Sequence, residues 1–287
     1  MKRNWAILSM ALGVVIAAIV GIVGVGQAAT STPKRSDSSS EPVYFIHGWE
    51  PLTRADCNDY WGAAMKEMRT WGWTGPQHTV GFYANDTNCG VTINRGDQST
   101  HIKDLGRKLA NEIYSRYSKK GKSVDVLAHS MGGLVIRAAL AGTAAKEQGF
   151  PPYLYVEDVV TLSTPHRGSA GFTRLCRSVQ CNEMSGDSPF LRSLQANPQS
   201  KQGTDWTMIG SDDDQVVSAD SATNISGGHR VIYRDGSNVN HGNITDTVRG
   251  TYKQKYWNAG DKQWHEVSKG AAPIKAASNA LFSWSKW

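Results

Sequence analysis

Short apolar runs alternate with longer amphipathic segments over residues 42–245 of this 287-residue chain. The short runs are rich in Val, Ile, Tyr and Phe, and six of them are expected to form strands, at residues 43–46, 79–83, 124–128, 156–162, 206–209 and 230–233. Over residues 102–117, apolar side chains recur at spacings of 3, 4, 4 and 4, which predicts one buried helix face. Residues 134–145 carry few charges and predict a second helix packed on a sheet. This alternation is typical of a single α/β domain with a mostly parallel sheet.

The first 28 residues contain the longest apolar run, with no charged residue between Arg3 and Gln27. Basic residues before the run and the small residues Gly26 and Ala28 at its end favour a signal peptide cleaved near Ala28. Its length of about 20 residues also suits a retained membrane anchor, which is the alternative. We expect a Ser-rich flexible linker over residues 29–41 and one folded domain over residues 42–287.

The four cysteines, Cys57, Cys89, Cys176 and Cys181, all follow this run. In an exported protein they most simply form two disulfides. Three pairings are possible, and the sequence-local one joins Cys57 to Cys89 and Cys176 to Cys181. Their spacing does not suit zinc, and we expect no metal site. A net charge of +6 without any Lys/Arg run longer than two residues argues against a nucleic-acid partner.

The predicted strand 124–128 runs directly into Ala128-His129-Ser130-Met131-Gly132-Gly133 and then into the predicted helix. A nucleophile elbow needs small residues on both sides of the nucleophile, because strand and helix come close together there. The usual pattern is G-x-S-x-G, in which Ala128 replaces the first glycine. Ser130 is therefore a candidate nucleophile, the alternative being a Gly-rich turn that carries an incidental serine.

These residues resemble the α/β-hydrolases, and more narrowly the secreted bacterial lipases whose nucleophile motif reads A-H-S-M-G-G. The resemblance extends to His47-Gly48 after the first strand, to T-P-H-R-G at residues 164–168 and to S-P-F-L at residues 188–191, and it covers about residues 42–245. It implies an α/β-hydrolase fold of about six mostly parallel strands flanked by helices, without a large cap domain. The motif does not specify the substrate, since esterases, thioesterases, acyltransferases and peptidases share it.

In this superfamily the nucleophile is followed along the chain by an acid and then by a histidine. The predicted strand 206–209 leads into three adjacent aspartates, Asp212, Asp213 and Asp214. The lipase-like pattern D-x-x-V selects Asp214, because Val217 follows it by three residues, and Asp212 is the runner-up. The other aspartates are expected to be surface groups of a solvated turn or oxygen ligands of a cation such as Ca²⁺.

Three histidines follow the aspartates. His229 precedes the last predicted strand, and His265 lies in a Trp-rich tail. His241 lies in a polar loop just past the strand 230–233, which is where this fold presents its base. His241 is therefore the expected general base, with an ordinary surface histidine as the alternative.

A tetrahedral intermediate requires two backbone N–H donors aimed at its oxyanion. Met131, directly after the nucleophile, is expected to supply one. By resemblance to the lipases, the residue after His47-Gly48 supplies the other, and here it is Trp49. The alternative is that His47-Gly48 only ends a strand.

The substrate is expected to enter near aromatic residues and a short loop. Most tryptophans are expected in the core, and Trp61, Trp71 and Trp73 are also candidates for an apolar surface that receives an acyl chain. Residues 171–202 are expected to form a small disulfide-tied loop over the site.

These features predict a secreted serine hydrolase of carboxylic esters, a lipase or esterase acting on triacylglycerols or similar lipid esters. Its partners are the ester substrate and a lipid interface, and the chemistry requires no cofactor. The alternatives are a polyester depolymerase or acyltransferase with the same three residues, and a non-catalytic surface-binding homologue.

Overall fold

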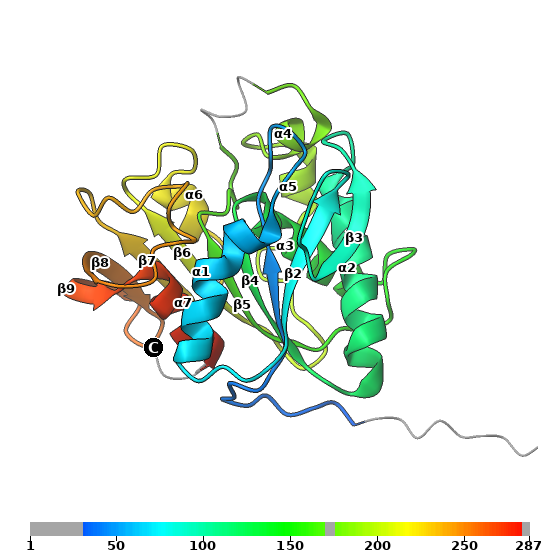
Figure 1. The fold of residues 1–287 in the computed structure, drawn as a ribbon, viewed down its shortest axis with the longest axis horizontal. Helices are drawn as coiled ribbons and strands as arrows, with labels where there is room; N and C mark the ends of the chain where they lie inside the picture. The colour runs from blue at the N-terminus through cyan, green and yellow to red at the C-terminus, as the bar shows by residue number, and fades with distance from the viewer. Residues whose placement is uncertain (1–30, 170–175, 283–287) are drawn as a thin grey trace, which may run out of the picture. The chain divides into compact units, whose positions relative to one another are not determined.

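The computed structural model describes residues 31–169 and 176–282, and these form a nine-stranded sheet flanked by helices (Figure 1). The strands are β1 (Val43–Ile46), β2 (Gln77–Tyr83), β3 (Val91–Gly96), β4 (Val124–His129), β5 (Val156–Leu162), β6 (Asp205–Ser211), β7 (His229–Tyr233), β8 (Thr251–Asn258) and β9 (Gln263–Ala271). The helices are α1 (Cys57–Thr70), α2 (Ile102–Arg116), α3 (Met131–Ala144), α4 (Val179–Glu183), α5 (Pro189–Ser193), α6 (Ala219–Thr223) and α7 (Pro273–Phe282), with a short 3-10 helix, η1 (Ser118–Lys120).

The strand order is β3-β2-β1-β4-β5-β6-β7-β8-β9. The first seven strands in this order are parallel, whereas β8 and β9 pair antiparallel. All six predicted strands are present, and the two predicted helices correspond to α2 and α3. The predicted α/β fold class is thus confirmed. The expected number of strands is wrong, because β3, β8 and β9 extend the sheet at its two edges.

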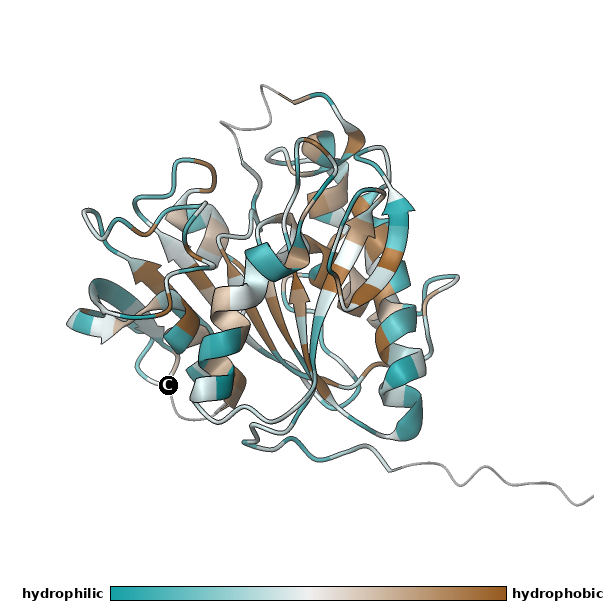
Figure 2. Ribbon diagram, viewed as in Figure 1, coloured by the Kyte–Doolittle hydropathy of each residue, from teal (hydrophilic) through white to brown (hydrophobic). Residues whose placement is uncertain are grey.

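Each of the three missed strands has only one buried residue, so they lack the continuous apolar runs of buried parallel strands. By contrast, every residue of β1 and β5 is buried. Figure 2 shows the hydrophobic residues concentrated along the central strands. The central strands could therefore be predicted because they are buried, whereas the outer strands could not because few of their residues are buried.

Successive residues of the central strands face two separate cores, as the period of two requires. Tyr44 and Ile46 of β1 pack in the core that α2 and α3 cover. Val43 and Phe45 pack in the other core, beneath α1 and α7. The sheet is thereby covered on both faces, which leaves the loops at the carboxyl ends of its strands as the place for a site.

Two of the tryptophans expected near an acyl chain belong to this second core. Trp61 is fully buried, and Trp73 is buried with its indole N–H donating to the Ser278 hydroxyl at 2.7 Å. The expectation of an apolar substrate surface is wrong for these two side chains, because α7 packs over them. Trp71 is partly exposed beside Lys275.

The disulfides join Cys57 to Cys89 and Cys176 to Cys181, which confirms the sequence-local pairing. The first ties the start of α1 to the segment before β3. The predicted leader lies outside the described residues. No helix in the described ranges is both long and apolar enough to cross a bilayer.

The part of the predicted linker from Arg35 to Glu41 is bonded to the domain. Arg35 forms an ion pair with Asp158 at 3.2 Å, and the Ser36 N–H donates to the Glu157 carboxylate at 2.8 Å. This segment therefore lies along the amino ends of the central strands.

Candidate active site

Ser130 lies at the turn between β4 and α3, at the carboxyl edge of the sheet. Its φ of 52° and ψ of −127° place a non-glycine residue in a sparsely populated backbone region. Such strain costs on the order of 1–3 kcal/mol and persists only where the surroundings impose it. The Ser130 N–H donates to the Leu162 carbonyl at 2.9 Å, which fixes the turn against β5.

The glycines after the serine allow this close packing. A Cβ on Gly132 would lie 2.5 Å from the carbonyl oxygens of Ile46 and His47, and one on Gly133 would collide with the Thr164 side chain. The sequence therefore needs glycine at both positions for α3 to start directly after the serine.

The structure brings Ser130, His241 and Asp214 into one hydrogen-bonded chain. The Ser130 hydroxyl lies 3.0 Å from His241 Nε2, and His241 Nδ1 lies 2.9 Å from Asp214 Oδ2. Because a carboxylate accepts, Nδ1 carries the proton toward Asp214, and Nε2 is left to accept from the serine. The arrangement can remove the proton of the Ser130 hydroxyl.

Asp214 is held by the backbone of its own loop. Its Oδ1 accepts from the N–H groups of Val216 and Val217 at 2.8 and 2.9 Å. Burial opposes ionisation, but the hydrogen bonds from His241 and Val217 outweigh it, so the pKa of Asp214 lies below its usual value. The carboxyl is therefore charged at neutral pH and can stabilise a cationic imidazole.

The two neighbouring aspartates face elsewhere. Asp212 forms an ion pair with Arg234 at 2.5 Å. Asp213 accepts from the backbone N–H groups of Gly236 and Asn238, at 3.1 and 2.7 Å. Asp213 thus shapes the loop that carries the histidine, whereas only Asp214 of the three contacts His241.

The two expected oxyanion donors lie beside the serine. A Cβ on Gly48 would lie 2.8 Å from Ser130 Cβ, so the backbone that leads into Trp49 passes close to the hydroxyl. Met131 begins α3, where the first N–H groups have no partner within the helix. Their role as donors stays a prediction.

Two cavities meet at Ser130, and both are lined by Trp49, Ser130 and His241. One, of about 270 Å³, is the more polar of the two and is lined by the carboxyl-bearing residues Glu50 and Asp246. The other, of about 240 Å³, is apolar, with walls formed by Pro51, Pro165, Met184, Val216 and Val217. The predicted loop over the site contributes Met184, directly after α4, to the apolar cavity.

Sequence reasoning missed two residues that support the nucleophile loop. The Gly48 N–H donates to the Tyr60 hydroxyl at 3.0 Å, and this hydroxyl donates to His129 Nδ1 at 2.6 Å. Burial, and then the nearby His241, lower the pKa of His129 well below its usual value, so this histidine is neutral and can accept. Asp86 contacts His47 Nε2 at 3.1 Å.

A family model described as a PGAP1-like alpha/beta domain matches residues 37–220, which is more than half of the chain. The chain belongs to this family. The matched region includes Ser130 and Asp214 and ends before His241. A search of curated proteins finds no match.

Several solved structures are similar in fold. A lipase from Bacillus licheniformis in its mature form is 17% identical over 66% of this chain and 82% of that one, with a TM-score of 0.43. Its propeptide form is 18% identical over the same 66%, with the same score, but the match spans only 44% of that longer chain.

Two further structures match 72% of this chain. A gene product of Listeria innocua is 13% identical over 89% of its chain, with a TM-score of 0.46. A thermophilic esterase from Thermogutta terrifontis is 12% identical over 85% of its chain, with a TM-score of 0.42. At these identities and TM-scores the matches carry no conclusion about activity or substrate. The α/β fold that the resemblance implies is confirmed by the strand order and by the match to the PGAP1-like alpha/beta family.

Proposed function

We propose that this chain is a secreted serine hydrolase of carboxylic esters, a lipase or esterase. The observation that carries the proposal is the continuous chain from Asp214 through His241 to Ser130, with distances of 2.9 and 3.0 Å. These are the geometry and the order of groups that activate a serine hydroxyl. The strained backbone at Ser130 adds support, because it projects the side chain at the junction of two cavities.

In the proposed reaction, Ser130 Oγ attacks the ester carbonyl carbon while His241 Nε2 takes its proton. Asp214 holds the imidazole in the required tautomer and stabilises its cationic form. The N–H groups of Trp49 and Met131 stabilise the oxyanion. The imidazole then gives the proton to the leaving alcohol, and water hydrolyses the acyl-enzyme with His241 as its base.

A lipid ester is the proposed substrate, because one of the two cavities is apolar and suits an acyl chain. Leu52 is 75% exposed and follows Pro51, which lines this cavity. A lipid interface is a further proposed partner, and Leu52 at the rim of the site would contact it.

Export is proposed on the apolar run at residues 1–28 and on the two disulfides, which persist in oxidising surroundings. N-terminal sequencing of the exported protein tests this proposal. We expect the exported protein to begin near residue 29. An intact Met1 on protein that stays bound to cells would instead show that the run is a retained membrane anchor.

Labelling with a fluorescent fluorophosphonate tests the chemistry. The wild type and Ser115→Ala, which changes an exposed serine on α2, are expected to label, whereas Ser130→Ala is not. Absence of wild-type labelling, or labelling of Ser130→Ala equal to that of the wild type, would refute Ser130 as the nucleophile. A series of p-nitrophenyl esters of increasing chain length then separates lipase from esterase, and product analysis separates hydrolysis from acyl transfer.

A further inference from the structure

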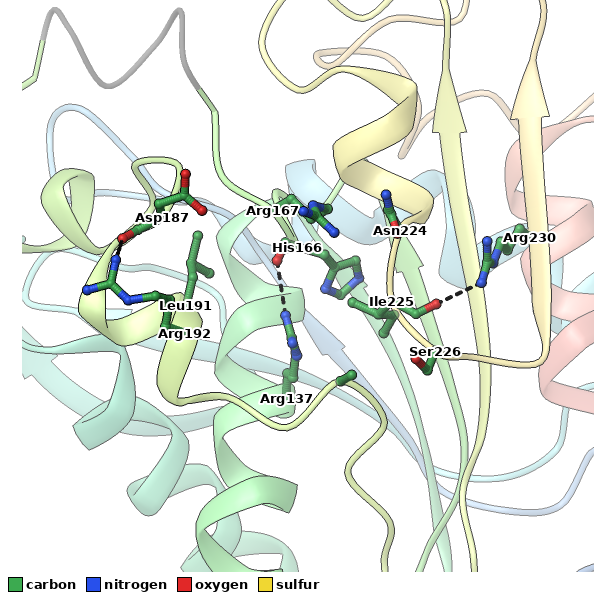
Figure 3. Close-up of a pocket in the computed structure, with 11 residues that line it drawn as sticks. Arg137, His166, Arg167, Asp187, Leu191, Arg192, Asn224, Ile225, Ser226 and Arg230 are labelled. Carbon is green, nitrogen blue, oxygen red and sulfur yellow. Dashed lines mark hydrogen bonds between the residues drawn. The ribbon is translucent and has the colours of Figure 1, made fainter.

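A separate cavity of about 290 Å³ lies on the other side of the loop that follows β5 (Figure 3). Pro165 of this loop lines the apolar cavity at Ser130, whereas the next two residues, His166 and Arg167, line the separate one. The remaining walls come from α3, α5 with its flanking residues, the segment between α6 and β7, and β7 itself. None of the three proposed catalytic residues lines this cavity.

Four arginines surround this cavity, against one carboxylate, that of Asp187. The arginines are Arg137, Arg167, Arg192 and Arg230. Within the described ranges none of the four forms an ion pair, whereas Arg35, Arg107, Arg116, Arg234 and Arg249 all do. The cavity therefore has a strong excess of positive charge that the described residues do not neutralise.

Three of these guanidinium groups donate to backbone carbonyls, and that of Arg192 does so to the carbonyl of Asp187. Arg137 is 4% exposed, and it donates to the carbonyls of Gln195 and His166 at 2.9 and 3.1 Å. Arg230 donates through Nη2 to the Ile225 carbonyl at 3.1 Å and lies over the Trp257 ring, 5.5 Å from its centroid, while its buried Nε has no hydrogen-bond partner in the part of the chain that the structure describes. Carbonyl oxygens orient a guanidinium group but leave its charge in place, and a buried unpaired charge is costly.

His166 adds a second buried polar group without a partner. It is 3% exposed, and its Nε2 contacts the Thr161 hydroxyl at 3.1 Å, whereas its Nδ1 is buried and bonds to none of the described residues. Burial, and then the charge of Arg137, lower the pKa of His166 well below its usual value, so the ring is neutral. A neutral ring that accepts from Thr161 at Nε2 has an N–H at Nδ1 to offer.

We propose that this cavity, the arginine pocket, binds the phosphate group of a ligand. A guanidinium group can donate two parallel hydrogen bonds to two oxygens of a phosphate, and it is weakly hydrated. Several guanidinium groups around one cavity therefore favour a multiply charged tetrahedral anion. Arg167 and Arg192, which are exposed, would reach the anion from the open side, and Arg137 from the buried side. The phosphate belongs either to a small soluble ester or to a lipid headgroup.

Titration calorimetry at low ionic strength tests the site with inorganic phosphate and glycerol 3-phosphate. The wild type is expected to bind both, and Arg167→Gln/Arg192→Gln to bind them at least about tenfold more weakly, because it loses two charge-assisted contacts. Arg95→Gln, which removes the charge of an exposed arginine on β3, is the matched control and should stay within about twofold of the wild type. Circular dichroism checks that the variants are folded.

Flotation with vesicles distinguishes the two sources of phosphate. If the pocket binds a lipid headgroup, the wild type floats with phosphatidylcholine vesicles only when they contain phosphatidic acid. The double variant then does not float with these vesicles. Arginine-dependent calorimetric binding without flotation assigns it to a soluble phosphate ester. Equal phosphate affinity of the wild type and the double variant, or no binding by the wild type at millimolar phosphate, overturns the proposal.

Discussion

Replacing Asp214 by asparagine isolates the role of its charge, because the shape of the side chain is kept. Asp214 Oδ1 accepts from two backbone N–H groups, of Val216 and Val217, at 2.8 and 2.9 Å. These donors retain the amide oxygen of an asparagine at the same place. The amide NH₂ then takes the position of Oδ2, which lies 2.9 Å from His241 Nδ1.

This exchange reverses the histidine tautomer. An NH₂ group donates, so His241 Nδ1 must accept and Nε2 must carry the proton. Nε2 then presents an N–H to Ser130 Oγ at 3.0 Å and no longer removes its proton. In a Ser-His-Asp site this change lowers kcat by about 10⁴, equivalent to about 5.5 kcal/mol of transition-state stabilisation.

Asp212→Asn is the matched control, since it makes the same chemical change two residues away. Asp212 pairs with Arg234 at the surface, and such pairs contribute little, so kcat should stay within about twofold of the wild type. The assay is hydrolysis of a soluble p-nitrophenyl ester at saturating substrate, with the midpoint of thermal unfolding as the check on folding. The assignment of Asp214 as the acid would be refuted if the Asp214→Asn variant kept more than about a tenth of the wild-type kcat while the Asp212→Asn variant was inactive.

Three further changes have defined outcomes. Gly48→Ala puts a methyl group 2.8 Å from Ser130 Cβ, so kcat for the same ester should fall by about 10² or more; unchanged kcat would contradict this close approach. Tyr60→Phe leaves the Gly48 N–H and His129 Nδ1 without their partner, and denaturant unfolding should show a loss of about 1–3 kcal/mol. Burial raises the pKa of Asp158 to about 8, so its contribution to stability is full below about pH 4 and is lost as the pH rises through 8. Asp158→Asn should flatten the change in unfolding free energy between pH 5 and pH 8, and an unchanged slope would exclude this residue as its source.

The central sheet was predictable because burial and sequence pattern coincide there. The predicted bounds of β1 and β5 are the observed ones, and these strands are buried throughout. In β8 only one residue of eight, Gln254, is buried, and it is polar. This strand is paired with β7 and β9 through its backbone, and such pairing leaves little trace in the side chains.

The D-x-x-V pattern that selected Asp214 corresponds to a hydrogen-bonded turn. In D-x-x-V, the residue three positions on supplies a backbone N–H to the aspartate, as Val217 does for Asp214. The pattern therefore describes a turn that fixes one carboxylate oxygen and turns the other toward the histidine. Asp213 instead accepts from the backbone N–H groups of Gly236 and Asn238, and Asp212 pairs with Arg234, although composition treats the three aspartates alike.

Tyr60 and Asp86 could not be found in the same way. Tyr60 precedes Ser130 by 70 residues, and its hydroxyl acquires a role only because α1 packs on the sheet beside β4. Asp86 likewise depends on the turn after β2, where its carboxylate accepts from the N–H groups of Phe82 and Tyr83. Contacts of this kind belong to tertiary structure and have no local pattern.

The charges around the two ends of the site constrain the proposed substrate. When an acyl chain occupies the apolar cavity, the alcohol part of the ester lies in the polar cavity with Glu50 and Asp246. Burial raises the pKa of both carboxyls, yet neither offers positive charge to an anionic group. Positive charge is found instead across the loop after β5, in the arginine pocket. We therefore expect esters of neutral or cationic alcohols at the Ser130 site and a phosphate-bearing ligand in the arginine pocket. The loop after β5 would then separate two sites that prefer ligands of opposite charge.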